Sequence, residues 1–154
     1  MKKNLKFKEI NTIAKKLSEY VSPGDVIVLI GDLGTGKTTF SKEFAMGLGV
    51  TENLKSPTFN YVLEYYSGRL PLYHFDVYRI SDPQEVYEIG YEDYIHGDGV
   101  SIIEWGDLIK SELPARYIEI DLDHVDEDSR NVELKYIGDE RKEKEMLSYV
   151  GLGY

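Results

Sequence analysis

Residues 24–39, GDVIVLIGDLGTGKTT, join a run of aliphatic residues to a glycine-rich turn that ends in a lysine and two threonines. Val26–Ile30 is continuously apolar and mostly β-branched, which is typical of a strand buried on both faces of a sheet. Lys37–Leu48 has the pattern of a helix, and Gly47 and Gly49 are placed to stop it. The stretch therefore predicts a strand, a tight glycine turn and a helix in direct succession.

The turn itself, GDLGTGKT over residues 31–38, matches G-x-x-x-x-G-K-[ST] at every fixed position. Glycines let consecutive backbone N–H groups turn toward one centre, where they and the helix N-terminus can bind a phosphate. Lys37 adds a positive charge for the β- and γ-phosphates, and the Thr38 hydroxyl is placed to ligate Mg²⁺. We therefore predict a nucleoside triphosphate site; the alternative is a glycine-rich turn without a ligand. The predicted binding residues of the turn are Asp32, Leu33, Gly34, Thr35, Gly36, Lys37 and Thr38.

The rest of the chain alternates helical and extended patterns, and the fold class that we predict is a three-layer α/β sandwich of the P-loop type. Two β-rich stretches separated by SGR suggest an antiparallel hairpin within a mixed central sheet. The charge cluster DHVDEDSR, residues 123–130, is interpreted as a solvated loop. Expected helices are Lys8–Tyr20, Lys37–Leu48, Asp82–Glu88 and Asp139–Tyr149, and expected strands are Val26–Ile30, Phe59–Tyr66, Leu70–Tyr78, Val100–Glu104, Tyr117–Leu122 and Val132–Ile137.

Composition limits the classes of function. With 154 residues, the chain is expected to form a single domain, residues 1–154. Its net charge of −10 disfavours direct binding of RNA or DNA. A polyphosphate therefore has to be bound by a local site such as the glycine turn. There are no cysteines, which excludes disulfides and thiolate metal sites. No apolar run is long enough to cross a bilayer and the basic start lacks a signal sequence, so we expect a cytoplasmic protein.

Two carboxylates are candidates for a catalytic or metal-binding role next to the phosphates. Glu104 ends the predicted strand VSIIE, at the edge of the sheet where α/β folds present functional groups. Asp76 lies in LYHFDVYR, where strand alternation places it on one face with His74 and Tyr78. A His-Asp pair with Arg79 nearby could orient water or sense the γ-phosphate. The alternative is a partly buried hydrogen-bonded cluster of structural origin.

Four blocks, GDLGTGKTT, SPTFNYVLEY, LYHFDVYR and IIEWGDLI, in this order and at these separations, resemble the bacterial TsaE family of small P-loop ATPases. The resemblance covers roughly Pro23 to Leu113. It implies a role in forming the threonylcarbamoyladenosine modification next to the anticodon of tRNA, with TsaB and TsaD as partner proteins. It also implies that the subunit binds that pair and hydrolyses ATP weakly, that TsaD carries out the transfer, and that tRNA is contacted only through the complex.

The same resemblance assigns roles to individual residues. It implies that Lys37 contacts phosphate, that Thr38 ligates magnesium and that Thr39 lies on the phosphate side. Asp76 would be catalytically important together with Lys37, and Glu104 would be both a catalytic residue and the acidic partner of the metal. Which of the two carboxylates touches the metal directly stays open.

Three further features belong to the matching blocks. Trp105, the only tryptophan, falls in the functional block and is implied to lie at the nucleotide site; otherwise a packing role at the sheet end is the simpler explanation. The segment of residues 56–58, SPT, resembles a switch in which Thr58 could approach the γ-phosphate, although Pro57 alone would explain a turn there. Gly106 stands where many relatives have proline, which puts the rigidity of that loop in doubt.

Two other functions are compatible with a phosphate-binding loop. A small-molecule kinase would share the loop, but it normally has a basic lid, and no arginine cluster follows the predicted hairpin. A nucleotide-gated binding module, in which the ATP-bound shape alone governs assembly, is the second alternative.

Overall fold

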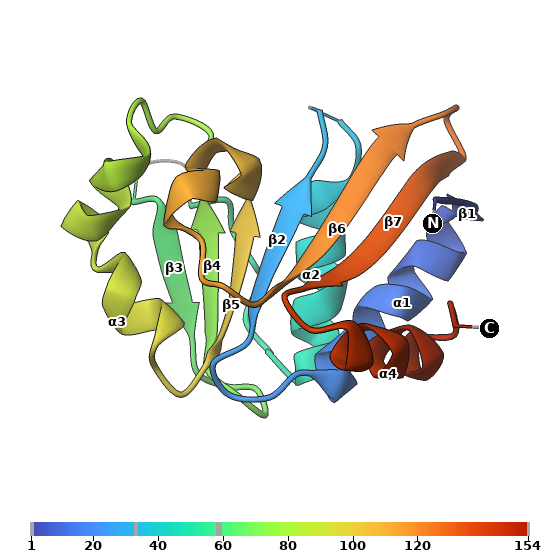
Figure 1. The fold of residues 1–154 in the computed structure, drawn as a ribbon, viewed down its shortest axis with the longest axis horizontal. Helices are drawn as coiled ribbons and strands as arrows, with labels where there is room; N and C mark the ends of the chain where they lie inside the picture. Colours follow the sequence, from blue (N-terminus) through green and yellow to red (C-terminus); the bar gives the residue numbers. More distant parts are fainter. Residues whose placement is uncertain (1, 33, 58–59, 154) are drawn as a thin grey trace.

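The computed structural model describes residues 2–32, 34–57 and 60–153 of the chain, and its centre is a seven-stranded sheet in the order β1-β7-β6-β2-β5-β4-β3 (Figure 1). β2 is central, and it lies parallel to both β5 and β6. β4 is parallel to β5, whereas the pairs β3–β4, β6–β7 and β1–β7 are antiparallel. The predicted mixed sheet with an antiparallel hairpin is confirmed. Along the chain the elements are β1 (Lys3–Lys6), α1 (Phe7–Tyr20), β2 (Val26–Ile30), α2 (Lys37–Leu48), β3 (Val62–Tyr65), β4 (Leu72–Asp76), η1 (Pro83–Ile89), α3 (Tyr91–Ile95), β5 (Val100–Glu104), η2 (Gly106–Glu112), β6 (Tyr117–His124), β7 (Ser129–Ile137) and α4 (Glu140–Val150).

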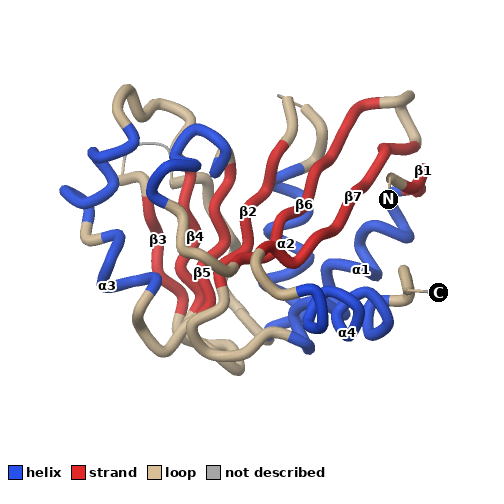
Figure 2. The backbone as a smooth tube through the Cα atoms, in the orientation of Figure 1, coloured by secondary structure: helices blue, strands red, loops and turns tan. Residues whose placement is uncertain are grey.

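Helices cover both faces of the sheet, which makes three layers (Figure 2). The side chains of β2 show why its sequence is apolar throughout: they alternate between the two layers. Ile27 and Leu29 join a core cluster with residues of α1, α2 and α4. Val26 and Val28 join a second cluster with residues of η1, α3 and η2. A strand with a buried side chain on each face has no position for a polar residue.

The observed elements differ from the expected ones where they are short. Strand β1, helix α3 and the 3₁₀ helix η2 were not expected, and η1 is a 3₁₀ helix. The hairpin strands are shorter than predicted, and Phe59, the expected start of the first, lies outside the described residues. Among the described residues, no helix is long and apolar enough to span a membrane.

The interpretation of residues 123–130 as a solvated loop is confirmed in part: residues 123–128 are exposed, but both ends of the segment belong to strands and residues 129–130 are buried. β6 continues to His124, and β7 begins at Ser129, so the connection is a short turn of residues 125–128. Arg130 is paired in register with Leu5 of β1, and only 6% of its surface is exposed. A sequence pattern of charges indicates solvent, but antiparallel pairing on both sides of β7 buries this arginine.

Candidate functional site

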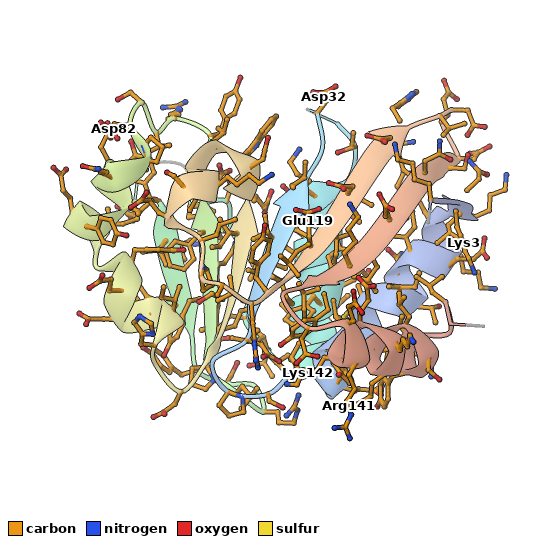
Figure 3. The ribbon with its side chains drawn as sticks, viewed as in Figure 1. Lys3, Asp32, Asp82, Glu119, Arg141 and Lys142 are labelled. Carbon is orange, nitrogen blue, oxygen red and sulfur yellow. The ribbon has the colours of Figure 1, made fainter. Side chains whose placement is uncertain are left out.

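The glycine turn follows the carboxyl end of β2 and leads directly into α2, as its sequence predicts. Gly31 lies so close to β6 that a Cβ atom there would be 2.5 Å from the carbonyl oxygen of Leu122. Gly36, the residue before α2, has φ +103°, a conformation that side-chain-bearing residues rarely adopt. Figure 3 shows Asp32 at the tip of this loop, above the end of the sheet. The glycines therefore meet one steric and one conformational requirement of the turn.

Lys37, the first residue of α2, is almost fully buried beside the loop. Its Nζ donates hydrogen bonds to the carbonyl oxygens of Gly31, at 2.5 Å, and Asp32, at 2.9 Å. The same atom lies 3.9 Å from the centroid of the Trp105 ring. Burial lowers the pKa of Lys37, while the nearby carboxylates of Glu104 and Asp76 oppose that shift. The ammonium group is thus held at the loop by two carbonyl oxygens, and phosphate oxygens could take their place as hydrogen-bond acceptors.

Glu104, at the end of β5, is the centre of a buried hydrogen-bond network. One carboxylate oxygen accepts from the Thr38 hydroxyl at 3.0 Å. The other accepts from Ser41 Oγ at 3.2 Å and from His74 Nε2 at 2.5 Å. Burial acts to raise the pKa of Glu104, but these hydrogen bonds outweigh it and hold the pKa below its ordinary value. Glu104 is therefore an ionised carboxylate that orients the hydroxyl of Thr38.

Asp76 ends β4 directly beside Glu104, because the two residues are partners in the parallel register of β4 and β5. Its Oδ1 accepts a hydrogen bond from the backbone N–H of Tyr78 at 3.0 Å. Burial raises the pKa of Asp76, and the charge of Glu104 adds to this effect although the Tyr78 hydrogen bond opposes it. Two adjacent carboxylates thus have pKa values shifted in opposite directions, an arrangement typical of sites with distinct acid and base roles.

These groups line one pocket of about 350 Å³ at the carboxyl edge of the sheet. Its walls are Gly34, Gly36, Lys37, Thr38, Thr39, Asp76, Tyr78, Glu104 and Trp105. Asp32 and Thr35 shape the loop instead, since Thr35 Oγ1 donates to the Asp32 carbonyl at 2.9 Å. The predicted residues Leu33 and Thr58 lie outside the described residues. A larger pocket of about 480 Å³ between β7 and α4 has no comparable cluster of catalytic groups among the described residues, so the chemistry favours the smaller one.

The predicted His-Asp pair is wrong in its partner. His74 is completely buried and bonds Glu104 of the neighbouring strand rather than Asp76 of its own. Ser41 was missed as well, although a signal was available: it follows Lys37 by four residues, so both lie on one face of α2. Tyr78 also contributes more than expected, because its ring packs against Trp105 with the ring centroids 4.7 Å apart and the planes tilted by 43°. The backbone of Trp105 has φ 65°.

Oxygen groups at the pocket fit a magnesium ion that is shared with a nucleotide. Among the described residues, there is no group of three or more His, Asp or Glu side chains that could form a metal cage alone. Mg²⁺ bound with phosphates needs no such cage, since it takes few protein ligands and keeps phosphate and water oxygens. The Thr38 hydroxyl and the Glu104 carboxylate, 3.0 Å apart, are of the required chemical type.

Comparison with known proteins gives a consistent result. The family model described as "Threonylcarbamoyl adenosine biosynthesis protein TsaE" matches residues 5–132. The chain is 44% identical over 141 residues to the tRNA threonylcarbamoyladenosine biosynthesis protein TsaE of Bacillus subtilis, with 88% of each chain covered. It is 44% identical over 109 residues to the protein of that name from Treponema pallidum, covering 71% of this chain and 80% of the relative. The crystal structure of Bacillus subtilis YdiB superposes with a TM-score of 0.78 at 37% identity, covering 98% of this chain and 96% of that one. The resemblance carried by the four sequence blocks is thus confirmed over most of the chain, which belongs to the TsaE family.

Proposed function

We propose that this protein is a magnesium-dependent ATPase subunit of the assembly that forms threonylcarbamoyladenosine next to the anticodon of tRNA. One observation carries the nucleotide part of the proposal: the phosphate loop, Lys37, Thr38, Asp76 and Glu104 line the same pocket. The family supports the biological role, because its relatives are named for biosynthesis of this modified nucleoside.

In this proposal each residue has a distinct task. The N–H groups of the loop and the ammonium of Lys37 bind the phosphates of ATP. Thr38 and Glu104 hold Mg²⁺, which neutralises charge on the β- and γ-phosphates. Asp76, whose pKa is raised by burial, is placed to orient the attacking water and accept its proton. Thr39 and Trp105 line the pocket and contact the nucleotide.

The acidic charge of the chain supports an indirect relation to tRNA. A net charge of −10 opposes contact with a phosphate backbone, so we assign the RNA contact to partner proteins, TsaB and TsaD. We also propose that residues 1–154 act as one ATPase domain, since β1 and β7 extend the same sheet that carries the loop. We place its activity in the cytoplasm.

Steady-state ATP hydrolysis with Mg²⁺, alone and after addition of TsaB and TsaD, tests the proposal. We expect weak turnover that the partners stimulate and that Lys37→Ala abolishes. Lys42→Ala is the matched control, because Lys42 is an exposed lysine on the same helix and outside the pocket. Unchanged turnover with partners, and no partner binding with or without ATP, would contradict the proposal.

A second variant separates hydrolysis from nucleotide-gated binding. Asp76→Ala is expected to bind ATP and the partners but to fail in supporting tRNA modification, because it lacks the group that activates water. If it supports modification at the wild-type level, the pure binding module is the better explanation. Phosphate transfer from ATP to nucleosides or sugars would instead identify a kinase.

A further inference from the structure

Arg130, the second residue of β7, reaches the phosphate loop from outside the pocket. Its Nε donates to the carbonyl oxygen of Thr35 at 3.1 Å, and its Nη2 donates to that of Gly34 at 3.2 Å. Its Nη1 donates to the carbonyl oxygens of Asp126 at 2.6 Å and Ser129 at 2.7 Å. The guanidinium group therefore ties two consecutive peptides of the loop to the β6–β7 turn.

This arginine is unusual in its surroundings. It is 6% exposed, and the ring of Phe7, at the start of α1, lies 4.8 Å from its guanidinium carbon. Within residues 2–32, 34–57 and 60–153, no ion pair joins it to a carboxylate. A buried cation costs free energy that only its partners can offset. All four hydrogen bonds end on backbone carbonyl oxygens, so Arg130 fixes the conformation of the backbone.

Peptide geometry connects these carbonyls to the phosphate side of the loop. In a trans peptide the C=O and the N–H point in opposite directions. The Thr35 carbonyl is held by Arg130, so the Gly36 N–H of the same peptide points away from the guanidinium, and Gly36 lines the pocket. The Gly34 carbonyl belongs to the peptide whose N–H, on Thr35, closes a turn onto the Asp32 carbonyl at 3.3 Å.

We propose that Arg130 is a positioning residue of the phosphate loop: it holds the Gly34 and Thr35 carbonyls so that the loop is shaped for phosphate before the nucleotide arrives. The proposal rests on the ATP-binding function proposed above. Preorganisation of this kind raises affinity because less order has to be gained on binding. A lysine is a poor substitute for Arg130. The planar guanidinium group has five N–H donors and binds several separated carbonyls at once, whereas a compact ammonium group cannot contact all of them.

The chain contains a second arginine that donates to backbone carbonyls and can serve as a control, although it is exposed where Arg130 is buried. Arg69, in the β3–β4 turn, donates through Nη2 to the carbonyl oxygens of Ser18 at 2.7 Å and Val21 at 2.9 Å, at the C-terminal end of α1. The β3–β4 turn precedes β4, whereas the phosphate loop follows the parallel strand β2, so the two arginines act at opposite ends of the sheet (Figure 1). Removal of either guanidinium group takes a donor away from backbone carbonyls, but only the carbonyls bound by Arg130 belong to the phosphate loop.

The test compares Arg130→Met, Arg130→Lys and Arg69→Met by calorimetric titration with ATP and ADP in Mg²⁺, and by urea unfolding. We expect both methionine variants to lose stability, while only Arg130→Met weakens nucleotide binding, by about 10-fold, the equivalent of one net hydrogen bond. Arg130→Lys is expected to weaken binding by about 3-fold or more, since it keeps the charge and loses the fork. An unchanged dissociation constant in folded Arg130→Met would overturn the proposal.

Two further outcomes are decisive. If Arg130→Met does not fold, wild-type affinity in Arg130→Lys overturns the proposal by itself. If Arg69→Met weakens nucleotide binding as much as Arg130→Met does, the effect is general destabilisation and positioning is refuted. Failure of the ATP-binding function is distinguishable, because the wild type would then show no more saturable binding than Lys37→Ala.

Discussion

The network around Glu104 allows a specific prediction, which concerns replacement of its carboxylate by the isosteric amide in Glu104→Gln. Glu104 is 3% exposed, and its carboxylate accepts hydrogen bonds from Thr38, Ser41 and His74. The amide can keep one acceptor oxygen toward His74 and Ser41, and its NH₂ group then faces the Thr38 hydroxyl, which can turn to accept. We therefore expect a folded protein in which hydrogen bonds to a charge become hydrogen bonds to a neutral group.

The magnitude follows from this exchange. A hydrogen bond to a charged group contributes roughly 1.5–3 kcal/mol and a neutral one about 1 kcal/mol, and the long Ser41 contact counts for little. Two such exchanges, at Thr38 and His74, amount to about 1–4 kcal/mol. Because the amide also removes the cost of burying a charge, Glu104→Gln is expected to lower the free energy of unfolding by about 1–2 kcal/mol at neutral pH. The lowered pKa of Glu104 supports the sign, because it means that the fold favours the ionised carboxylate despite its burial.

The pH dependence tests the cause. A folded pKa below the ordinary value of 4.5 stabilises the protein above about pH 4.5, and this contribution is lost as the pH falls through the folded pKa. The assay is urea unfolding followed by circular dichroism at pH 7.5 and pH 3.5, with Glu64→Gln as the control. Glu64 is exposed and accepts from the hydroxyls of Tyr66 and Tyr94, so its replacement is expected to change stability by less than about 0.5 kcal/mol.

Either of two results would refute this reasoning. A Glu104→Gln variant as stable as the wild type at pH 7.5 would show that the hydrogen bonds do not outweigh the cost of burying the charge. A stability difference of equal size at pH 3.5 and pH 7.5 would show that the ionised state of Glu104 is not its source.

Two other predictions concern stability alone. Burial and the charge of Glu119 raise the pKa of Asp121 to about 6, so the contribution of Asp121 to stability falls as the pH rises from about 4 through 6. Asp121→Asn is therefore expected to gain up to about 1 kcal/mol at pH 7.5 after solvent screening, and little at pH 4. An equal gain at both pH values would contradict the assignment. A Cβ on Gly106 would be 2.4 Å from Cγ1 of Val28, so Gly106→Ala is expected to cost about 1–3 kcal/mol in urea unfolding. Val28→Ala in the same chain should relieve the clash, and a double variant whose loss equals the sum of the single losses would exclude it.

Local signals were sufficient for the elements that carry the site. Val26–Ile30, Lys37–Leu48 and Val100–Glu104 have in the structure the bounds that were expected from the sequence. Each is set by neighbours along the chain: a continuous apolar run for a doubly buried strand, and glycines on either side of a helix. By contrast β1, with residues Lys3–Lys6, has no local pattern and exists as a strand because it pairs with β7 far along the chain.

The side-chain partnerships at the site depend on the order of the strands. Alternation places His74 on the same face as Asp76, but it does not reveal that β5 lies alongside β4 and brings Glu104 opposite. For the same reason the sequence indicated a solvated Arg130, while pairing of β7 with both β1 and β6 buries it against the phosphate loop.

What the sequence determined by itself is therefore the phosphate loop, its lysine and hydroxyl, and the layered α/β class, because these follow from residue type and short-range spacing. What only the tertiary structure decided is which side chains and backbone groups meet: His74 with Glu104, Lys37 with Trp105, and Arg130 with the loop carbonyls. These contacts join residues that are distant in the chain, and their geometry comes from strand order and register, for which short-range patterns carry no information.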